Sequence, residues 1–151
     1  MTLWAFALAA WERPGVSEAC LKLQDRHGQC VPLLLWRGWA TAEGRRVAGP
    51  LLAEAVALAR AHEREVIAPL RAARRAAQVE KPSPDRQCVK AAQEREIAAE
   101  RALLGALESL TPSPSQLRAG RRLAADLEGL ARIWNGSRAR AAVQALAARL
   151  A

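Results

Sequence analysis

The run Val31-Pro32-Leu33-Leu34-Leu35-Trp36-Arg37-Gly38-Trp39-Ala40 decides the fold of this 151-residue chain. Pro32 suits the first turn of a helix, because the amide groups of that turn have no partner within the helix. The residues that follow are apolar on nearly every side, so other helices must enclose the helix that they form. The sequence therefore predicts a central, buried helix over residues 32–44.

Stretches of helical length surround this run, and Pro, Gly and Ser separate them. Their apolar residues recur at helical spacing, and the period-two alternation typical of strands is missing. The sequence predicts an all-α protein, a compact bundle of six to seven helices without a β-sheet. The other predicted helices span 3–11, 16–27, 50–77 with a break or kink at Pro69, 84–110 with Ser83 as its cap, 115–134, and a last stretch that ends at 150.

The polar residues 80–84 form the clearest boundary in the chain. We expect residues 1–79 to form a Trp-rich helical core domain, joined by this linker to an Ala- and Arg-rich helical extension over 85–151. The extension should pack on the first part as one domain.

Helical spacing also predicts which large apolar side chains form the core. Ile97, Leu103, Leu104, Leu107 and Leu110 are expected on the apolar face of the helix over 84–110, and Val66 on that of the helix before it. Trp4, Trp11, Trp36 and Trp39 are expected in the core as well, and the alternative is that they line an aromatic pocket with Phe6. Arg37, between two of these tryptophans, is expected to lie over an indole face.

Basic residues are concentrated in the second half of the chain. There are 23 basic and 15 acidic residues, which gives a formal net charge of +8. Residues 1–68 carry eight basic and seven acidic groups, whereas 69–151 carry fifteen and eight. A solvated basic face, enriched by codon bias, and a surface for an anionic partner both fit this pattern. The candidate surface consists of Arg71, Arg74 and Arg75, then Arg118, Arg121 and Arg122, with a further cluster at Arg132, Arg138 and Arg140.

A smaller polar group is the second candidate site. Gln24 and Asp25 lie near the end of a predicted helix, where an aspartate is unfavourable against the helix dipole. An arginine partner or a capping role would compensate Asp25, and a ligand or catalytic role is the alternative. His62 completes the candidate polar site. No metal is expected there, because H-E-x-x-H and C-x-x-C spacings are missing.

Three motifs occur in order along the chain: Leu21-Lys22-Leu23-Gln24-Asp25-Arg26-His27-Gly28, Leu33-Leu34-Leu35 and Pro69-Leu70-Arg71. The patterns L-x-L-Q-D-x-x-G, L-L-L and P-L-R at these spacings resemble an uncharacterised family of short bacterial all-helical proteins. The resemblance covers about residues 3–75, and it implies a shared helical fold and no known activity. Cys30 and Pro32 depart from the pattern, where we would expect an Asp and an Asn.

The motifs of common enzymes are missing, including G-x-S-x-G and the glycine-rich phosphate loops. Three cysteines without metal or disulfide spacing indicate reduced thiols in a cytoplasmic protein. The apolar residues 2–11 are too few to span a bilayer, which requires about 20. We therefore predict a cytoplasmic, non-catalytic protein without cofactors that binds another macromolecule as an adaptor or accessory protein. A protein partner is expected. Nucleic-acid binding through the arginine clusters is one alternative, and a small-ligand or enzyme site around Gln24, Asp25 and His62 is another.

Overall fold

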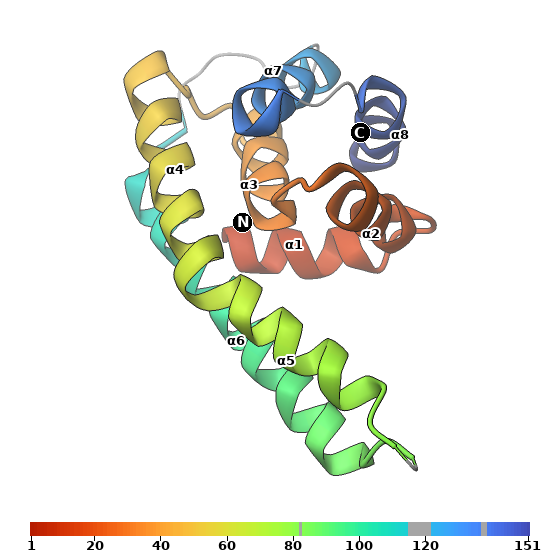
Figure 1. The fold of residues 1–151 in the computed structure, drawn as a ribbon. Helices are drawn as coiled ribbons and strands as arrows, with labels where there is room; N and C mark the ends of the chain where they lie inside the picture. Colours follow the sequence, from red (N-terminus) through yellow and green to blue (C-terminus); the bar gives the residue numbers. More distant parts are fainter. Residues whose placement is uncertain (82, 115–121, 137–138) are drawn as a thin grey trace.

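The computed structural model describes residues 1–81, 83–114, 122–136 and 139–151 (Figure 1). These residues contain helices and no strand, which confirms the all-α prediction. In chain order the elements are α1 (Leu3–Trp11), α2 (Val16–His27), α3 (Val31–Ala42), α4 (Gly49–His62), the π-helical turn η1 (Glu63–Ile67), α5 (Ala68–Gln78), α6 (Arg86–Leu110), α7 (Leu123–Asn135) and α8 (Arg140–Leu150). None of the helices in the described ranges is long and apolar enough to cross a membrane.

α3 lies at the centre of the body, as its sequence predicts. Nine of its twelve residues are buried, and Trp36 and Trp39 are completely enclosed. α1, α2, α4, α6 and α7 all pack against it. Burial of one large apolar side chain contributes about 1.5–3 kcal/mol, so the side chains of α3 hold these five helices together.

The indole N–H groups of α3 find partners on other elements. Trp36 Nε1 donates to Thr111 Oγ1 over 2.8 Å, and Trp39 Nε1 donates to the carbonyl of Met1 over 3.0 Å. The Thr111 hydroxyl in turn donates to the carbonyl of Leu107 over 2.6 Å. A buried indole N–H without a partner is costly, so this relay helps to fix where α6 ends beside α3.

Two predictions about the tryptophans are wrong. Trp11, at the end of α1, is 43% exposed and is not a core residue. Arg37 does not lie over an indole, because its Nη2 pairs with Asp126 Oδ1 of α7 over 2.8 Å. A carboxylate satisfies a half-buried guanidinium more strongly than an aromatic face does. Arg45 lies over the Trp39 ring instead, 4.3 Å from its centre.

Pro69 interrupts the α-helical hydrogen bonding, but the helix does not end there. α4, η1 and α5 follow one another directly, with Pro69 in the first turn of α5. The wider π turn accommodates the missing N–H group and the bulky proline ring. A π turn holds an extra residue and so rotates the positions that follow it. Ile67 is therefore fully buried, whereas Val66, which was predicted on the apolar stripe, is exposed.

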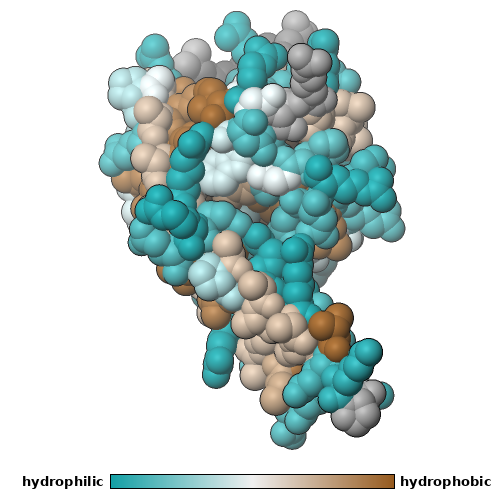
Figure 2. Space-filling view, in the orientation of Figure 1, coloured by the Kyte–Doolittle hydropathy of each residue, from teal (hydrophilic) through white to brown (hydrophobic). Residues whose placement is uncertain are grey.

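α5 and the first half of α6 leave the body together as a helical hairpin, which we call the arm (Figure 1). No residue of α5 is fully buried, and the buried residues of α6 begin at Glu96. Figure 2 shows pale brown residues flanked by hydrophilic ones along the arm, in keeping with the alanine-rich sequence of α5. Asp85 caps α6 by accepting two amide N–H groups over 2.8 and 3.2 Å, so the prediction of Ser83 as the cap is wrong.

α7 and α8 complete the body. α7 packs on α3 and on α8, and α8 packs on α2. Buried side chains of both helices, including Leu127, Leu130 and Leu146, belong to the same core cluster as those of α3. Apolar residues from before and after the linker at 80–84 therefore share one core.

Replacing Thr111 by valine tests the hydrogen-bond relay at the end of α6. Valine keeps the shape but leaves the Trp36 indole N–H buried without an acceptor, so we expect the free energy of unfolding to fall by about 1–3 kcal/mol. Trp36→Phe removes the donor, and the double variant should lose less than the sum of the two single losses. Urea unfolding followed by circular dichroism measures all three values. Strictly additive losses would mean that the two groups do not interact.

Candidate binding groove and its ion-pair cluster

An apolar groove opens where the arm leaves the body. Eight large apolar side chains are exposed among the described residues, and four of them line this groove. Exposed apolar side chains that gather in one place commonly mark an interaction surface. We define the groove by these four side chains and two polar neighbours: Leu8, Trp11, Leu21, Gln24, Ile97 and Glu100.

The groove consists of two adjoining hollows. The inner hollow, of about 230 Å³, lies between α1, the start of α3 and α6, and its wall includes Trp4, Leu35 and Leu104. The outer hollow, of about 270 Å³, extends along α6 towards Arg74 of the arm. α1 packs against α6 at this level, beside the point where the arm begins (Figure 1).

Ile97 is exposed because α6 changes partners along its length. It was predicted on the buried face of α6, but 52% of it is accessible to solvent. The residues of α6 that follow it, including Leu103 and Leu107, are buried in the core. At the level of Ile97 this side of α6 borders the groove instead.

An ion-pair cluster joins η1, α5 and α6 at the root of the arm. Glu96, only 6% exposed, accepts hydrogen bonds from two guanidinium groups. Arg71 Nε lies 3.0 Å from Glu96 Oε1, and Arg74 Nε binds Glu96 Oε2. Arg71 Nη1 also donates to Glu63 Oε1 over 2.6 Å. Pairs this well hydrogen-bonded are what allow a carboxylate such as Glu96 to be buried.

Glu100 is the carboxylate that this cluster leaves without a close partner. Arg71 Nη2 lies 3.9 Å from Glu100 Oε1, beyond hydrogen-bond distance, and no hydrogen bond joins the Glu100 side chain to any other described residue. Burial first, and then the nearby charge of Glu96, raise the pKa of Glu100 from 4.5 to about 7. Glu63 Oε2 is also buried without a hydrogen-bond partner in the described part of the chain. The cluster therefore holds three carboxylates against two guanidinium groups.

The predicted polar site does not form as a unit. Gln24 lines both hollows of the groove. Asp25 Oδ1 pairs with Arg75 Nη2 of the arm over 2.7 Å, so an arginine compensates its position at the helix end, as the dipole argument predicts. His62 Nε2 lies 3.2 Å from the carbonyl of Ala99 on α6, which is a structural contact. Across the described ranges, no group of three His, Cys, Asp or Glu is placed to hold a metal ion.

The first predicted arginine cluster is largely used inside the molecule. Arg71 and Arg74 bind carboxylates of the ion-pair cluster, and Arg75 binds Asp25. These guanidinium groups neutralise nearby carboxylates. In the second cluster, Arg118 and Arg121 lie outside the described residues, and Arg122 is exposed at the start of α7.

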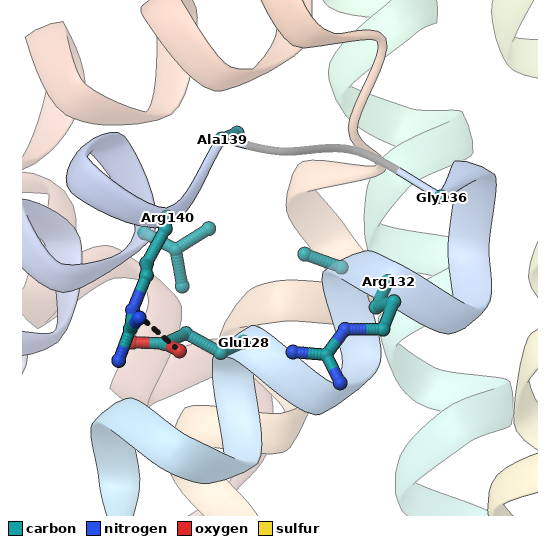
Figure 3. Close-up of a pocket in the computed structure, with 7 residues that line it drawn as sticks. Glu128, Arg132, Gly136, Ala139 and Arg140 are labelled. Atoms are coloured by element: carbon teal, nitrogen blue, oxygen red, sulfur yellow. Dashed lines mark ion pairs between the residues drawn. The ribbon is translucent and has the colours of Figure 1, made fainter.

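A larger hollow, of about 480 Å³, lies between α7 and α8 (Figure 3). Arg132 and Arg140 extend into it on either side of Glu128. Glu128 is already partnered, since its Oε2 pairs with Arg140 Nε over 3.3 Å and its Oε1 accepts from Gln144 Nε2 over 2.7 Å. Arg138 of the third predicted cluster lies outside the described residues. Because the Glu128 carboxylate is satisfied within the molecule, we take the groove and not this hollow as the candidate site.

Two of the three cysteines are buried thiols. Burial raises the pKa of both Cys20 and Cys30 to about 12. They are therefore protonated at neutral pH, and a protonated thiol is a poor nucleophile and a poor metal ligand. Cys88 is exposed on the arm.

The three motifs that carry the family resemblance meet at this site. Gln24 lines the groove, Leu35 forms part of its inner wall, and Arg71 joins the ion-pair cluster. Residues 2–107 match the family described as "Protein of unknown function (DUF2390)". The chain belongs to this family. The match to DUF2390 extends past residue 75 to residue 107, near the end of α6, and so includes every residue of the groove. No curated protein and no solved structure matches the chain.

Sequence reasoning missed Glu96 and Glu100, although the sequence holds one signal for Glu96. Glu96 lies seven and eleven residues before Leu103 and Leu107, which places it on the apolar stripe of α6. A charged residue within such a stripe needs a buried partner of opposite charge. The partners are on α5, and nothing local in the sequence relates them to Glu96.

Glu96→Gln and Glu100→Gln should change stability in opposite directions, although each removes one carboxylate from α6. Glu96→Gln removes the negative charge that two guanidinium groups share and turns one of its two acceptor oxygens into an NH₂ donor, so we expect a loss of about 3 kcal/mol in the free energy of unfolding. Glu100→Gln removes an unpaired, partly desolvated charge and should stabilise the protein at about pH 8. Urea unfolding of the two variants and the wild type gives both differences.

The benefit of Glu100→Gln should depend on pH. A carboxyl group whose pKa is raised on folding contributes stability below its unfolded value, near 4.5, and this contribution is lost as the pH rises through about 7. Between about pH 5 and pH 8 we expect the wild type to lose on the order of 2 kcal/mol relative to the variant, allowing for solvent screening. Unfolding curves across this range test the expectation, and parallel pH profiles for the two proteins would refute it.

The thiols give an independent check on the core. We expect DTNB to modify Cys88 in the native protein, because Cys88 is exposed. The reaction should be slower than that of a free thiol, because Asp85 raises the pKa of Cys88. Cys20 and Cys30 should react only after unfolding, since both are buried. In a Cys88→Ser variant the fast phase should disappear. A second fast-reacting thiol in the native wild type would show that the body is more open than described.

Proposed function

We propose that this protein binds a segment of another protein in the groove and acts as an adaptor or accessory protein without catalysis. The observation that supports the proposal most is the gathering of Leu8, Trp11, Leu21 and Ile97 at one place. Large apolar groups on a soluble protein usually occur singly, and contiguous ones favour association. Trp is also enriched among the residues that contribute most to protein–protein binding.

The division of the groove into two hollows favours a protein segment over a small molecule. The hollows measure about 230 and 270 Å³. Two small adjoining hollows suit successive apolar side chains of a bound helix or extended segment. Protein segments bound in grooves use such side chains as anchors.

The state of the reactive groups supports binding without catalysis. The buried thiols are protonated at neutral pH, and the His62 ring contacts a backbone carbonyl. Glu96 is held by two guanidinium groups. A cytoplasmic location belongs to the same proposal, and the free thiols of Cys20, Cys30 and Cys88 support it.

A protein partner is favoured over a nucleic acid. Binding to a phosphate backbone requires several cationic side chains that are free to contact phosphates. Arg71, Arg74 and Arg75 are instead engaged with Glu63, Glu96 and Asp25.

Two isoleucine substitutions test the proposal. Ile97 and Ile133 are similarly exposed, at 52% and 49%, but only Ile97 lines the groove. Ile97→Glu places a charge among apolar groups and should weaken binding about a hundredfold, as the loss of a central interface residue does. Ile133→Glu is the matched control and should bind like the wild type. Each immobilised protein is exposed to nuclease-treated lysate of the source cells, and the retained proteins are then titrated in purified form.

The proposal requires a protein that the wild type and Ile133→Glu retain and Ile97→Glu does not. Equal retention by all three would move the binding surface away from the groove. A companion that is retained only from lysate without nuclease treatment, with affinity that falls steeply as salt rises, would favour nucleic-acid binding instead.

A further inference from the structure

The groove carries a charge as well as an apolar rim, and this charge restricts the chemistry of the partner. We infer that the bound segment places a lysine or arginine side chain against Glu100, between the apolar side chains that enter the two hollows. This inference rests on the proposed function, because it requires a groove that binds a protein segment.

The first support is the imbalance of charge in the ion-pair cluster. Glu96 takes a hydrogen bond from each guanidinium group, and Arg71 gives a further one to Glu63. Glu100 is left with a single contact of 3.9 Å to Arg71. One negative charge therefore lacks a partner whenever Glu100 is ionised, and a cation from outside would balance it.

The second support is the position of Glu100. It lines both the inner and the outer hollow, so a side chain that enters either one reaches it. Ile97, Trp11 and Gln24 share both hollows with it. A long basic side chain suits this setting, because its methylene stem can pack on apolar groups while its charged end meets the carboxylate.

Other occupants fit this site less well. An acidic or phosphorylated segment would bring a negative charge towards Glu100 and Glu96, and like charges disfavour association. A wholly apolar segment would cover Glu100 without giving it a partner, which penalises a carboxylate. A basic residue between apolar ones avoids both costs.

The charged groups around Glu100 determine how binding depends on pH. They are Glu96 on α6, Arg71 and Arg74 on α5, Glu63 on η1, and the thiols of Cys20 on α2 and Cys30 at the start of α3. The pKa of Glu100 itself is raised to about 7, which is near neutrality. A bound cation competes with the proton on Glu100, so affinity for a basic segment should rise from about pH 6 to pH 8.

A peptide selection tests the inference. Short random peptides displayed on phage are selected against the wild type, Glu100→Gln and Ile97→Glu proteins. We expect the wild type to enrich peptides that combine aromatic or aliphatic residues with Lys or Arg. Glu100→Gln should enrich apolar peptides without the basic preference, and Ile97→Glu, which removes part of the apolar rim, should enrich no peptides with apolar anchors.

Titration of one enriched peptide then isolates the charge pair. Replacing its basic residue by glutamine should weaken binding to the wild type about tenfold. The same replacement should have little effect on binding to Glu100→Gln, and with that variant the dependence on pH should disappear.

A groove without a cationic partner and a surface that binds no segment would give different results. Enriched peptides without a basic residue would overturn the cationic partner and leave the groove as a binding site. An equal loss of affinity for the wild type and Glu100→Gln when the basic residue is replaced would do the same. No enrichment by the wild type beyond that of Ile97→Glu would overturn the inference and the proposed function together.

Discussion

The enclosure of α3 is the constraint on which the rest of the molecule depends. A helix that is apolar on nearly all sides must be covered, and five other helices cover it. α6 has 25 residues, but it contributes to this cover only from Glu96 onward. Its first half has no core to cover and pairs with α5 as the arm. The groove lies at the change between these two roles, where α1 and α2 border α6 and leave Ile97 exposed.

At the root of the arm, where apolar packing ends, ion pairs connect the helices. Glu96 and its two arginines connect α5 to α6, and Arg75 connects α5 to Asp25 on α2. Part of the positive charge of the sequence is therefore neutralised within the fold, because these arginines bind carboxylates that the fold brings to them. Glu100 is left with the surplus negative charge beside an apolar rim. The strongly basic chain thus presents an acidic feature at its candidate binding site.

The sequence was a good guide to local structure and a poor guide to the site, for physical reasons. Gly28 ends α2 in the left-handed conformation, and Thr2 caps α1, because these signals act over a few residues. Trp11 has the helical spacing of a core residue, but its exposure depends on where α1 ends relative to α6. Val66 was misassigned because the π turn before Pro69 shifts the helical face by one residue.

The candidate site combines residues whose relation only the tertiary fold establishes. Gln24 was recognised at a helix end, but its neighbours in the groove are Trp11 and Glu100, on two other helices. The carboxylates were missed because their partners lie on α5, more than twenty residues away. The amino-acid composition gives a net positive charge, but it carries no information about which charges are neutralised within the fold.

Site-specific photo-crosslinking in living cells tests the central claim most directly. A photoreactive phenylalanine analogue is introduced at Ile97, in the groove, and separately at Ile133, which is equally apolar and exposed but lies outside it. We expect a discrete covalent adduct with another protein from position 97 and none from position 133. An adduct from position 133 alone, or none from position 97, would contradict that claim.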